Sequence, residues 1–343
     1  MGKETGRYQY LDLLRGGGTL AVVLFHTSMP NEPIETITSI LFSWCVPAFV
    51  MITGALYLRT EKDASLSTMI SKATDLLVVL ITWSLLYNLV SLSLIEKSFS
   101  KAVLLRSIIM ILSADTTFCF QFWYLYLSIG LYILIPFIKP WVNKITEFDG
   151  ATYERELSFF VLLLLSIGIP TFVRVINYEG HVWKDAFVPF SCYAFYLICG
   201  HFVHKFGISM RIKWTLSASV IVQLMLCIIW IVMGNSEKAI KLSGYSSVLT
   251  WSMVTLLFDI VREKSDKIIN TAAGRFLLLI ADNSRGIFIL HVIMLTLLRK
   301  ANQHFELIKN GYGFAIAQFI GAVCFSLFIA KLLKKTPIIN KVL

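Results

Sequence analysis

Charged residues are scarce in this chain: Asp, Glu, Lys and Arg together make up 15% of its 343 residues. Soluble domains usually carry about 25%. Apolar residues reach 57% of the sequence, the mean hydropathy is +0.72, and long apolar runs recur along nearly the whole length. Together these values exclude an ordinary soluble domain and predict an all-α, polytopic membrane bundle.

The sequence also lacks several motifs that would indicate other classes of protein. None of the six cysteines forms a CxxC pair, so we expect buried core residues rather than a disulfide framework or a metal site. No motif of a nucleic-acid module occurs, and the net charge of +10 is interpreted as topology and contact with anionic lipid. The first residues lack a signal-peptide cleavage pattern.

The apolar runs predict ten membrane spans, since about 20 residues cross a bilayer. No linker is long enough to separate domains, so residues 1–343 are expected to form one domain. Segment 101–113 is too short to cross and is expected to lie at the membrane surface. The predicted spans are 11–29, 37–58, 74–95, 118–138, 157–176, 186–204, 214–233, 245–261, 276–298 and 312–333.

The distribution of basic residues predicts the orientation of the bundle. With ten spans both termini lie on one side, and that side receives nineteen Lys and Arg residues against nine on the other. Cytoplasmic loops carry an excess of Lys and Arg. We therefore expect both the N and the C terminus to be cytoplasmic.

The first polar constellation lies in predicted span 1. Asp12 and Arg15 are three residues apart and can pair on one helix face, while Arg15 and His26 are eleven apart, about three turns. Arginine suits a phosphate, and a neutral imidazole suits proton abstraction from a hydroxyl. Residues 16–18, all glycine, favour either a phosphorylated ligand near the backbone or a close helix–helix contact.

The second constellation lies in predicted span 9. Asp282, Asn283, Ser284 and Arg285 are consecutive polar residues in an apolar stretch that also holds His291. Such a run needs a polar cavity or neighbouring helices. Ser284 and His291 are two turns apart, too far for direct hydrogen bonding as a nucleophile and base, so Ser284 is expected to line the site.

His26 and His291 are expected at the same depth in the membrane. Counted from the cytoplasmic side, His26 follows Leu11 by 15 residues, and His291 follows Phe276 by the same number. At about 1.5 Å per residue, both imidazoles are expected about 22 Å deep. Arg15 and His26, on one helix face, are expected to form one wall of a polar shaft that is basic at its mouth. A buried structural histidine is the competing interpretation of His26, and a bis-histidine haem site with His291 is a further one.

The remaining histidines, the C-terminal lysines and three aromatic residues are interpreted without a catalytic role. We expect the histidines to be solvated or interfacial. The lysines are expected to end the last span on the cytoplasmic side, and the aromatic residues to form a membrane belt or packing contacts. These residues are His181, His201, His204 and His304; Lys331, Lys334 and Lys335; and Trp123, Tyr124 and Tyr126.

Four stretches in order resemble the acyltransferase-3 family of integral membrane acyltransferases. Any one of the four is a weak signal, and their order along nearly the whole chain makes the resemblance specific. They are YLDLLRG with the Arg15–His26 spacing, VPAFVMITGALYL (46–58), FWYLYLSIGLYILIPFI (122–138) and NSRGIFILH (283–291).

The resemblance implies transfer of an acyl group, usually acetyl, from cytoplasmic acetyl-CoA to a hydroxyl of a surface or exported glycan, at a bacterial cytoplasmic membrane. It places Arg15 and His26 at the positions of the essential pair and His291 at the late histidine. The paired basic residues that commonly open helix 3 in the family are reduced here to Lys72, with no proline after it.

The resemblance and the polar shaft together give a mechanistic expectation. Phosphates of coenzyme A would meet Arg15, Lys72 and Arg285, His26 would act as general base, and Ser284 or Asn283 would stabilise the oxyanion. An exporter or flippase for a lipid-linked sugar, with the shaft as its path, remains the alternative.

Overall fold

The computed structural model describes residues 8–147, 152–175 and 192–336, which form helices and connecting turns without any strand. The helical fold class is as predicted. The helices are α1 (Gln9–Phe25), α2 (Glu32–Phe42), α3 (Cys45–Tyr57), α4 (Leu66–Glu96), α5 (Lys101–Leu112), η1 (Phe120–Phe122), α6 (Trp123–Glu147), α7 (Thr152–Leu163), η2 (Leu164–Gly168), α8 (Ile169–Val175), α10 (Cys192–Phe206), α11 (Met210–Val232), α12 (Ser236–Ser243), α13 (Val248–Ile269), α14 (Ala272–Asp282), α15 (Ser284–Phe305) and α16 (Gly311–Leu333).

Short polar residues begin many of these helices. The side chain of Ser65 accepts a hydrogen bond from Thr68 N at the start of α4, and Thr271 accepts one from Gly274 N at the start of α14. Such caps satisfy backbone N–H groups that have no partner within the helix. The caps of the same kind are Asn31, Ser100, Ser209, Asn235, Ser247 and Asn310.

Within the described residues, five helical segments are long and apolar enough to cross a membrane, or seven if each of two bent pairs counts as one span. The chain is therefore a multi-pass membrane protein. The number ten, the bilayer position of α5 and the side of the termini stay predictions. Part of the predicted span 186–204 and His181 lie outside the described residues.

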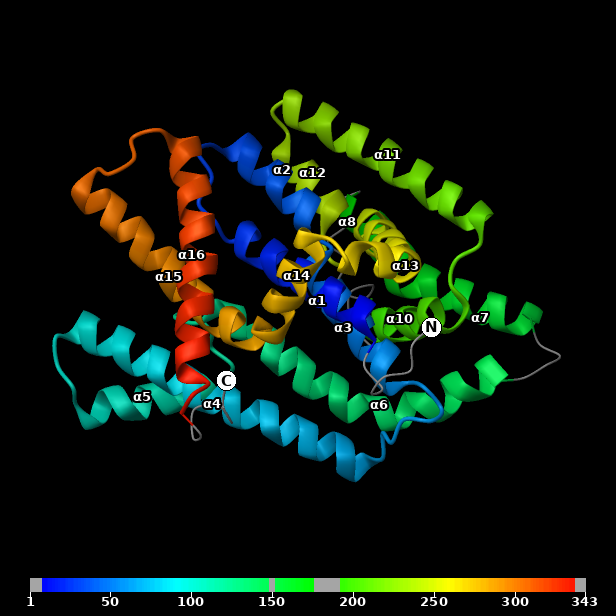
Figure 1. Cartoon of the computed structure of the whole chain (residues 1–343), viewed down its shortest axis with the longest axis horizontal. Coiled ribbons are helices and arrows are strands. Elements are labelled where there is room, and N and C mark those ends of the chain that lie inside the picture. The colour runs from blue at the N-terminus through cyan, green and yellow to red at the C-terminus, as the bar shows by residue number, and fades with distance from the viewer. Residues whose placement is uncertain (1–7, 148–151, 176–191, 337–343) are drawn as a thin grey trace.

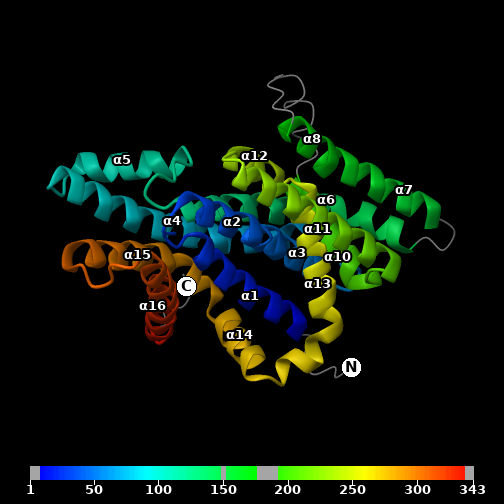
Figure 2. The same ribbon diagram turned by 90° about the horizontal axis from the view of Figure 1, so that it is seen from above.

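Helix α1 lies at the centre of the bundle (Figures 1 and 2). It contacts α3, α13, α14 and α15, and the largest apolar cluster joins α1 to α3, α10 and α13. A helix in this position is surrounded by protein. Polar groups on α1 therefore face other helices rather than lipid.

Glycines allow two pairs of helices to pack backbone to backbone. A Cβ added to Gly54 of α3 would lie 1.9 Å from Leu197 O of α10, and one added to Gly200 would lie 2.1 Å from Met51 O. Between α1 and α14, a Cβ added to Gly16 would lie 2.1 Å from Leu277 O. For Gly16 the structure therefore supports the helix–helix interpretation of the glycine run.

Helix α11 shows the opposite pattern on the outside of the bundle (Figure 1). Only 11% of its most apolar window is buried, and large side chains such as Trp214 and Val232 are exposed. Exposed apolar helices are stable where lipid surrounds them. This helix is thus a lipid-facing wall of the bundle.

Two predicted elements differ from the structure. Predicted span 276–298 is not one helix, because α14 and α15 meet at an 84° bend. Predicted span 11–29 ends earlier: α1 stops at Phe25, and His26 is its C-cap with φ −96° and ψ 0°. His26 therefore lies at the end of the helix rather than within it.

Candidate functional site

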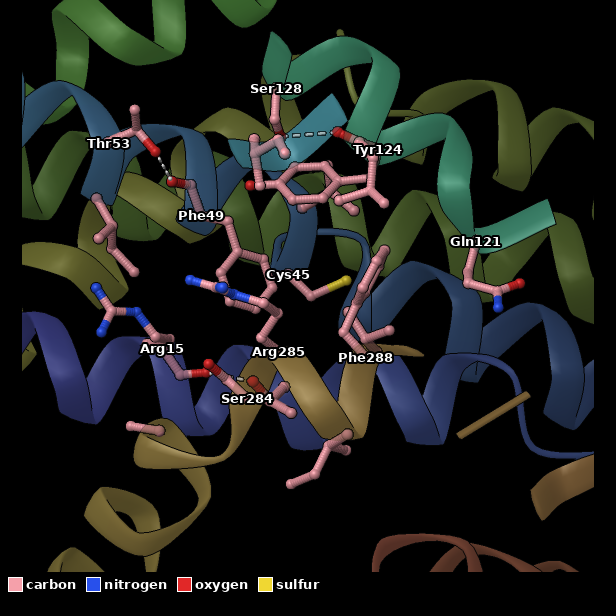
Figure 3. Close-up of a pocket in the computed structure, with 18 of the residues that line it drawn as sticks. Arg15, Cys45, Phe49, Thr53, Gln121, Tyr124, Ser128, Ser284, Arg285 and Phe288 are labelled. Carbon is pink, nitrogen blue, oxygen red and sulfur yellow. Dashed lines mark hydrogen bonds between the residues drawn. The ribbon is translucent and has the colours of Figure 1, made fainter. Parts of the chain in front are cut away.

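A cavity of about 630 Å³ lies between α1, α3, α6 and the start of α15. Its size falls in the range of sites that bind small molecules. Arg15 and Arg285 lie toward one end of this cavity, and Gln121 lies at the other (Figure 3). The cavity therefore has a basic end and a neutral polar end.

Arg15 is held at the basic end by its neighbour one turn earlier. Its Nη1 donates to Asp12 Oδ1 at 2.8 Å, as the sequence spacing predicted. The Asp12 carboxylate is buried, whereas the Arg15 side chain is 32% exposed. This contact uses one of five guanidinium N–H donors, so donors remain for a ligand in the cavity.

Two further groups reach the basic end. Arg285 extends from the first turn of α15 (Figure 3). Lys334, immediately after α16, also lines the cavity, and its Nζ donates to Asp282 O and to Asn283 Oδ1. Lys334 is therefore also a cavity residue, a role that its position after the last span did not predict. Only the packing of α16 against α15 brings it here, and no local pattern signals that.

The bend between α14 and α15 explains the polar run 282–285. Asn283 is both the C-cap of α14 and the N-cap of α15, and its Nδ2 donates to Leu279 O at 2.9 Å. Polar side chains are needed where a helix breaks inside an apolar bundle. Ser284 lines the cavity, whereas Asn283 is buried in these contacts and does not.

The same bend brings the two histidines together. The centroids of the His26 and His291 rings lie 5.6 Å apart with an interplanar angle of 26°, and both rings line the cavity. Span 9 is not the straight helix that the expected equal depth of the two rings required, because α14 and α15 meet at an 84° bend. The contact instead arises because α15 turns away from α14 and passes the end of α1.

The hydrogen bonds of His291 define its tautomer. Its Nδ1 lies 2.8 Å from Phe288 O and 3.1 Å from Ile287 O. Because both partners are acceptors, the network assigns the proton of the neutral ring to Nδ1. The buried Nε2, which has no hydrogen-bond partner among the described residues, then presents a lone pair. His291 is therefore a base oriented by the backbone of its own helix.

His26 is less enclosed than His291. It is partly exposed, and its ring makes edge contacts with Phe25 and Phe120 at centroid distances of 5.2 and 4.9 Å. These contacts orient the ring without using its nitrogens. A partly exposed imidazole beside a buried one gives two bases with different access to a ligand.

Several cavity residues were missed by sequence reasoning. Trp123 and Tyr124 line the cavity, and so do Gln121, Ser128 and Thr53. In Figure 3, Ser128 lies one turn from Tyr124, while Thr53 and Gln121 lie on opposite sides of the cavity. Aromatic residues at the start of a span have the same composition in either role. Only the tertiary packing of α6 on α1 and α3 identifies them as cavity residues.

Lys72 and two other histidines lie elsewhere. Lys72 is exposed on α4 and is not among the cavity residues. His201 is buried, with 2% exposure, and His204 hydrogen bonds Tyr10, so the expectation of solvated rings was wrong for His201. His304 is exposed, as expected. The described residues hold no group of three His, Cys, Asp or Glu side chains that could bind a metal ion.

The model of a protein family described as an acyltransferase domain matches residues 8–334. No curated protein and no solved structure matches the chain. The family match covers all the helices that form the cavity.

Proposed function

Because the chain belongs to the acyltransferase-3 family, we propose that it transfers an acyl group, usually acetyl, from acyl-CoA to a hydroxyl of a surface or exported glycan. The observation that carries the proposal is a single cavity with arginines toward one end and two adjacent imidazoles on its wall. Guanidinium groups bind phosphates, and neutral imidazoles can transfer protons. We further propose that the protein resides in a bacterial cytoplasmic membrane.

The residues of the cavity fit a coenzyme A donor. Arg15, Arg285 and Lys334 supply positive charge at one end, and guanidinium groups donate in parallel to phosphate oxygens. Apolar side chains such as Phe49 and Phe288 line the space beyond them. A cavity with a basic end and apolar walls suits a donor with an anionic head and a slender, mostly neutral arm.

In the proposed reaction, His26 Nδ1 or Nε2 removes the proton from the acceptor hydroxyl. The hydroxyl oxygen then forms a bond to the acyl carbon, the carbon–sulfur bond breaks, and the proton passes from the imidazolium to the departing sulfur. The products are an ester and a free thiol. The Ser284 hydroxyl, which lines the cavity, can donate to the oxygen on which negative charge develops.

The direct test is acyl transfer by the purified protein. Labelled acetyl-CoA, protein in lipid vesicles and glycan extracted from cells without the gene are expected to give base-labile label in the glycan. Absence of label, together with glycan movement across the vesicle membrane without covalent change, would instead favour the exporter.

Arg15→Lys is expected to weaken coenzyme A binding about tenfold. The variant keeps a positive charge opposite the buried Asp12 but loses the guanidinium fork, worth about 1.5 kcal/mol in a hydrogen bond to a charged group. Isothermal titration with coenzyme A measures the effect.

Lys72→Gln is the matched control for the arginine variant, because Lys72 is exposed outside the cavity. Its dissociation constant should equal that of the wild type. Equal affinities for Arg15→Lys and the wild type would contradict the assignment of the basic end to the donor phosphates.

A further inference from the structure

Gln121 lies in the short 3-10 turn η1, directly before α6. The turn is closed by Phe122 N donating to Cys119 O at 2.8 Å. The side chains on either side of Gln121 point in different directions. The Phe120 ring contacts the His26 ring at a centroid distance of 4.9 Å, and the Phe122 ring packs on the Tyr87 ring at a centroid distance of 5.3 Å. Gln121 is therefore held by a fixed backbone between the apolar core and the histidine pair.

The Gln121 amide is buried, with 2% exposure, and its Oε1 has no hydrogen-bond partner in the described structure. The polar group beside the amide is the Tyr87 hydroxyl. Because that hydroxyl donates its proton to Ile289 O at 2.6 Å, it can accept from Gln121 Nε2 but cannot donate to Oε1. A buried acceptor without a donor is costly, so it is retained where a ligand completes its hydrogen bond.

The donor and acceptor atoms of the Gln121 amide indicate which kind of ligand can complete its hydrogen bonds. The thioester carbonyl of the donor can accept from Gln121 Nε2 but cannot satisfy its Oε1, which needs a hydroxyl or an N–H from a sugar or from an amide of the donor arm. Phosphates bind best at the basic end, and Gln121 lies at the opposite end of the cavity (Figure 3). Neighbouring sugar hydroxyls offer both a donor and an acceptor at the spacing of one amide group.

The surroundings of Gln121 also suit a sugar. Trp123, two residues further along, lines the same cavity and stacks on Tyr245 with a centroid distance of 5.8 Å and an interplanar angle of 27°. Large aromatic surfaces beside a few fixed polar groups are typical of sites that orient a partly apolar ligand. Gln121 and Trp123 lie on the consecutive elements η1 and α6, and Tyr245 lies in the connection between α12 and α13.

We propose that Gln121 is a specificity-determining residue that binds the sugar acceptor, donating from Nε2 to one hydroxyl and accepting at Oε1 from its neighbour. The inference rests on the proposed function and adds the acceptor side of the site. It places the reacting hydroxyl beside the histidine pair, because Phe120 of the same turn contacts His26.

The test separates acceptor binding from folding and from donor binding. Gln121→Met has a similar shape without the amide, and Gln303→Met is the matched control, because Gln303 is exposed near the end of α15. For each variant we measure the thermal midpoint, the dissociation constant of coenzyme A, and the KM for extracted glycan with labelled acetyl-CoA.

Gln121→Met is expected to raise the KM for glycan about tenfold or more, since at least one hydrogen bond to the acceptor is lost. Its thermal midpoint should change little, because Oε1 has no partner in the free protein and only the contact of Nε2 with the Tyr87 hydroxyl is lost. The dissociation constant of coenzyme A should stay within twofold of the wild type. Gln303→Met should match the wild type in all three measurements.

Two results would overturn the inference while leaving the proposed function intact. The first is an unchanged KM for glycan in Gln121→Met. The second is a loss of thermal stability or of coenzyme A affinity, which would make Gln121 a structural or donor-binding residue. A wild-type protein that binds coenzyme A but labels no glycan would instead overturn the proposed function itself.

Discussion

His26→Ala is expected to lower acyl transfer by at least 100-fold while the protein stays folded and binds coenzyme A. Loss of a general base typically costs about 10²–10⁴ in rate. The backbone N–H of His26 bonds to Val22 O and Val23 O, and alanine preserves those bonds at the end of α1. The measurement is single-turnover transfer of labelled acetyl groups to glycan.

The control is His304→Ala, which removes an exposed imidazole from the last turn of α15. Its turnover should equal that of the wild type. Near wild-type turnover in His26→Ala would contradict the assignment of His26 as base. If His291→Ala alone abolished transfer, the buried Nε2 of His291 would be the better assignment.

Gly16→Ala is expected to destabilise the bundle by several degrees in thermal midpoint, or to prevent its accumulation in the membrane. The new Cβ would lie 2.1 Å from Leu277 O, so α1 and α14 would have to separate. Overpacking of this kind costs about 1–3 kcal/mol or more. Scanning fluorimetry in detergent measures the midpoint.

Gly17→Ala is the matched control, one residue along the same helix. A Cβ there meets no atom within 4 Å, and alanine favours helix by about 0.5–1 kcal/mol over glycine. Its midpoint should stay the same or rise slightly. Equal thermal midpoints for Gly16→Ala and the wild type would contradict the close backbone contact between α1 and α14 at Gly16.

Local patterns predicted the parts of the site that depend on one helix. The three-residue spacing of Asp12 and Arg15 gave their ion pair, and apolar runs gave the positions of most helices. These features need only helical periodicity and side-chain chemistry. The helix containing Arg15 could therefore be placed from sequence, apart from its end at Phe25.

Features that depend on tertiary packing could not be predicted in this way. The polar run at 282–285 indicated a cavity, but the same residues also mark an 84° bend, which periodicity does not distinguish. Lys334 and Gln121 reach the cavity through the packing of α16 and η1. His201 is buried because α10 packs closely on α3 through Gly54 and Gly200.

The most direct test of the account is a structure of the protein bound to coenzyme A. The phosphates are expected within ion-pair distance of Arg15 and Arg285, and the thiol beside the His26 and His291 rings, in the cavity that these four residues line. A nucleotide bound outside this cavity, or a thiol directed away from the two imidazoles, would contradict it.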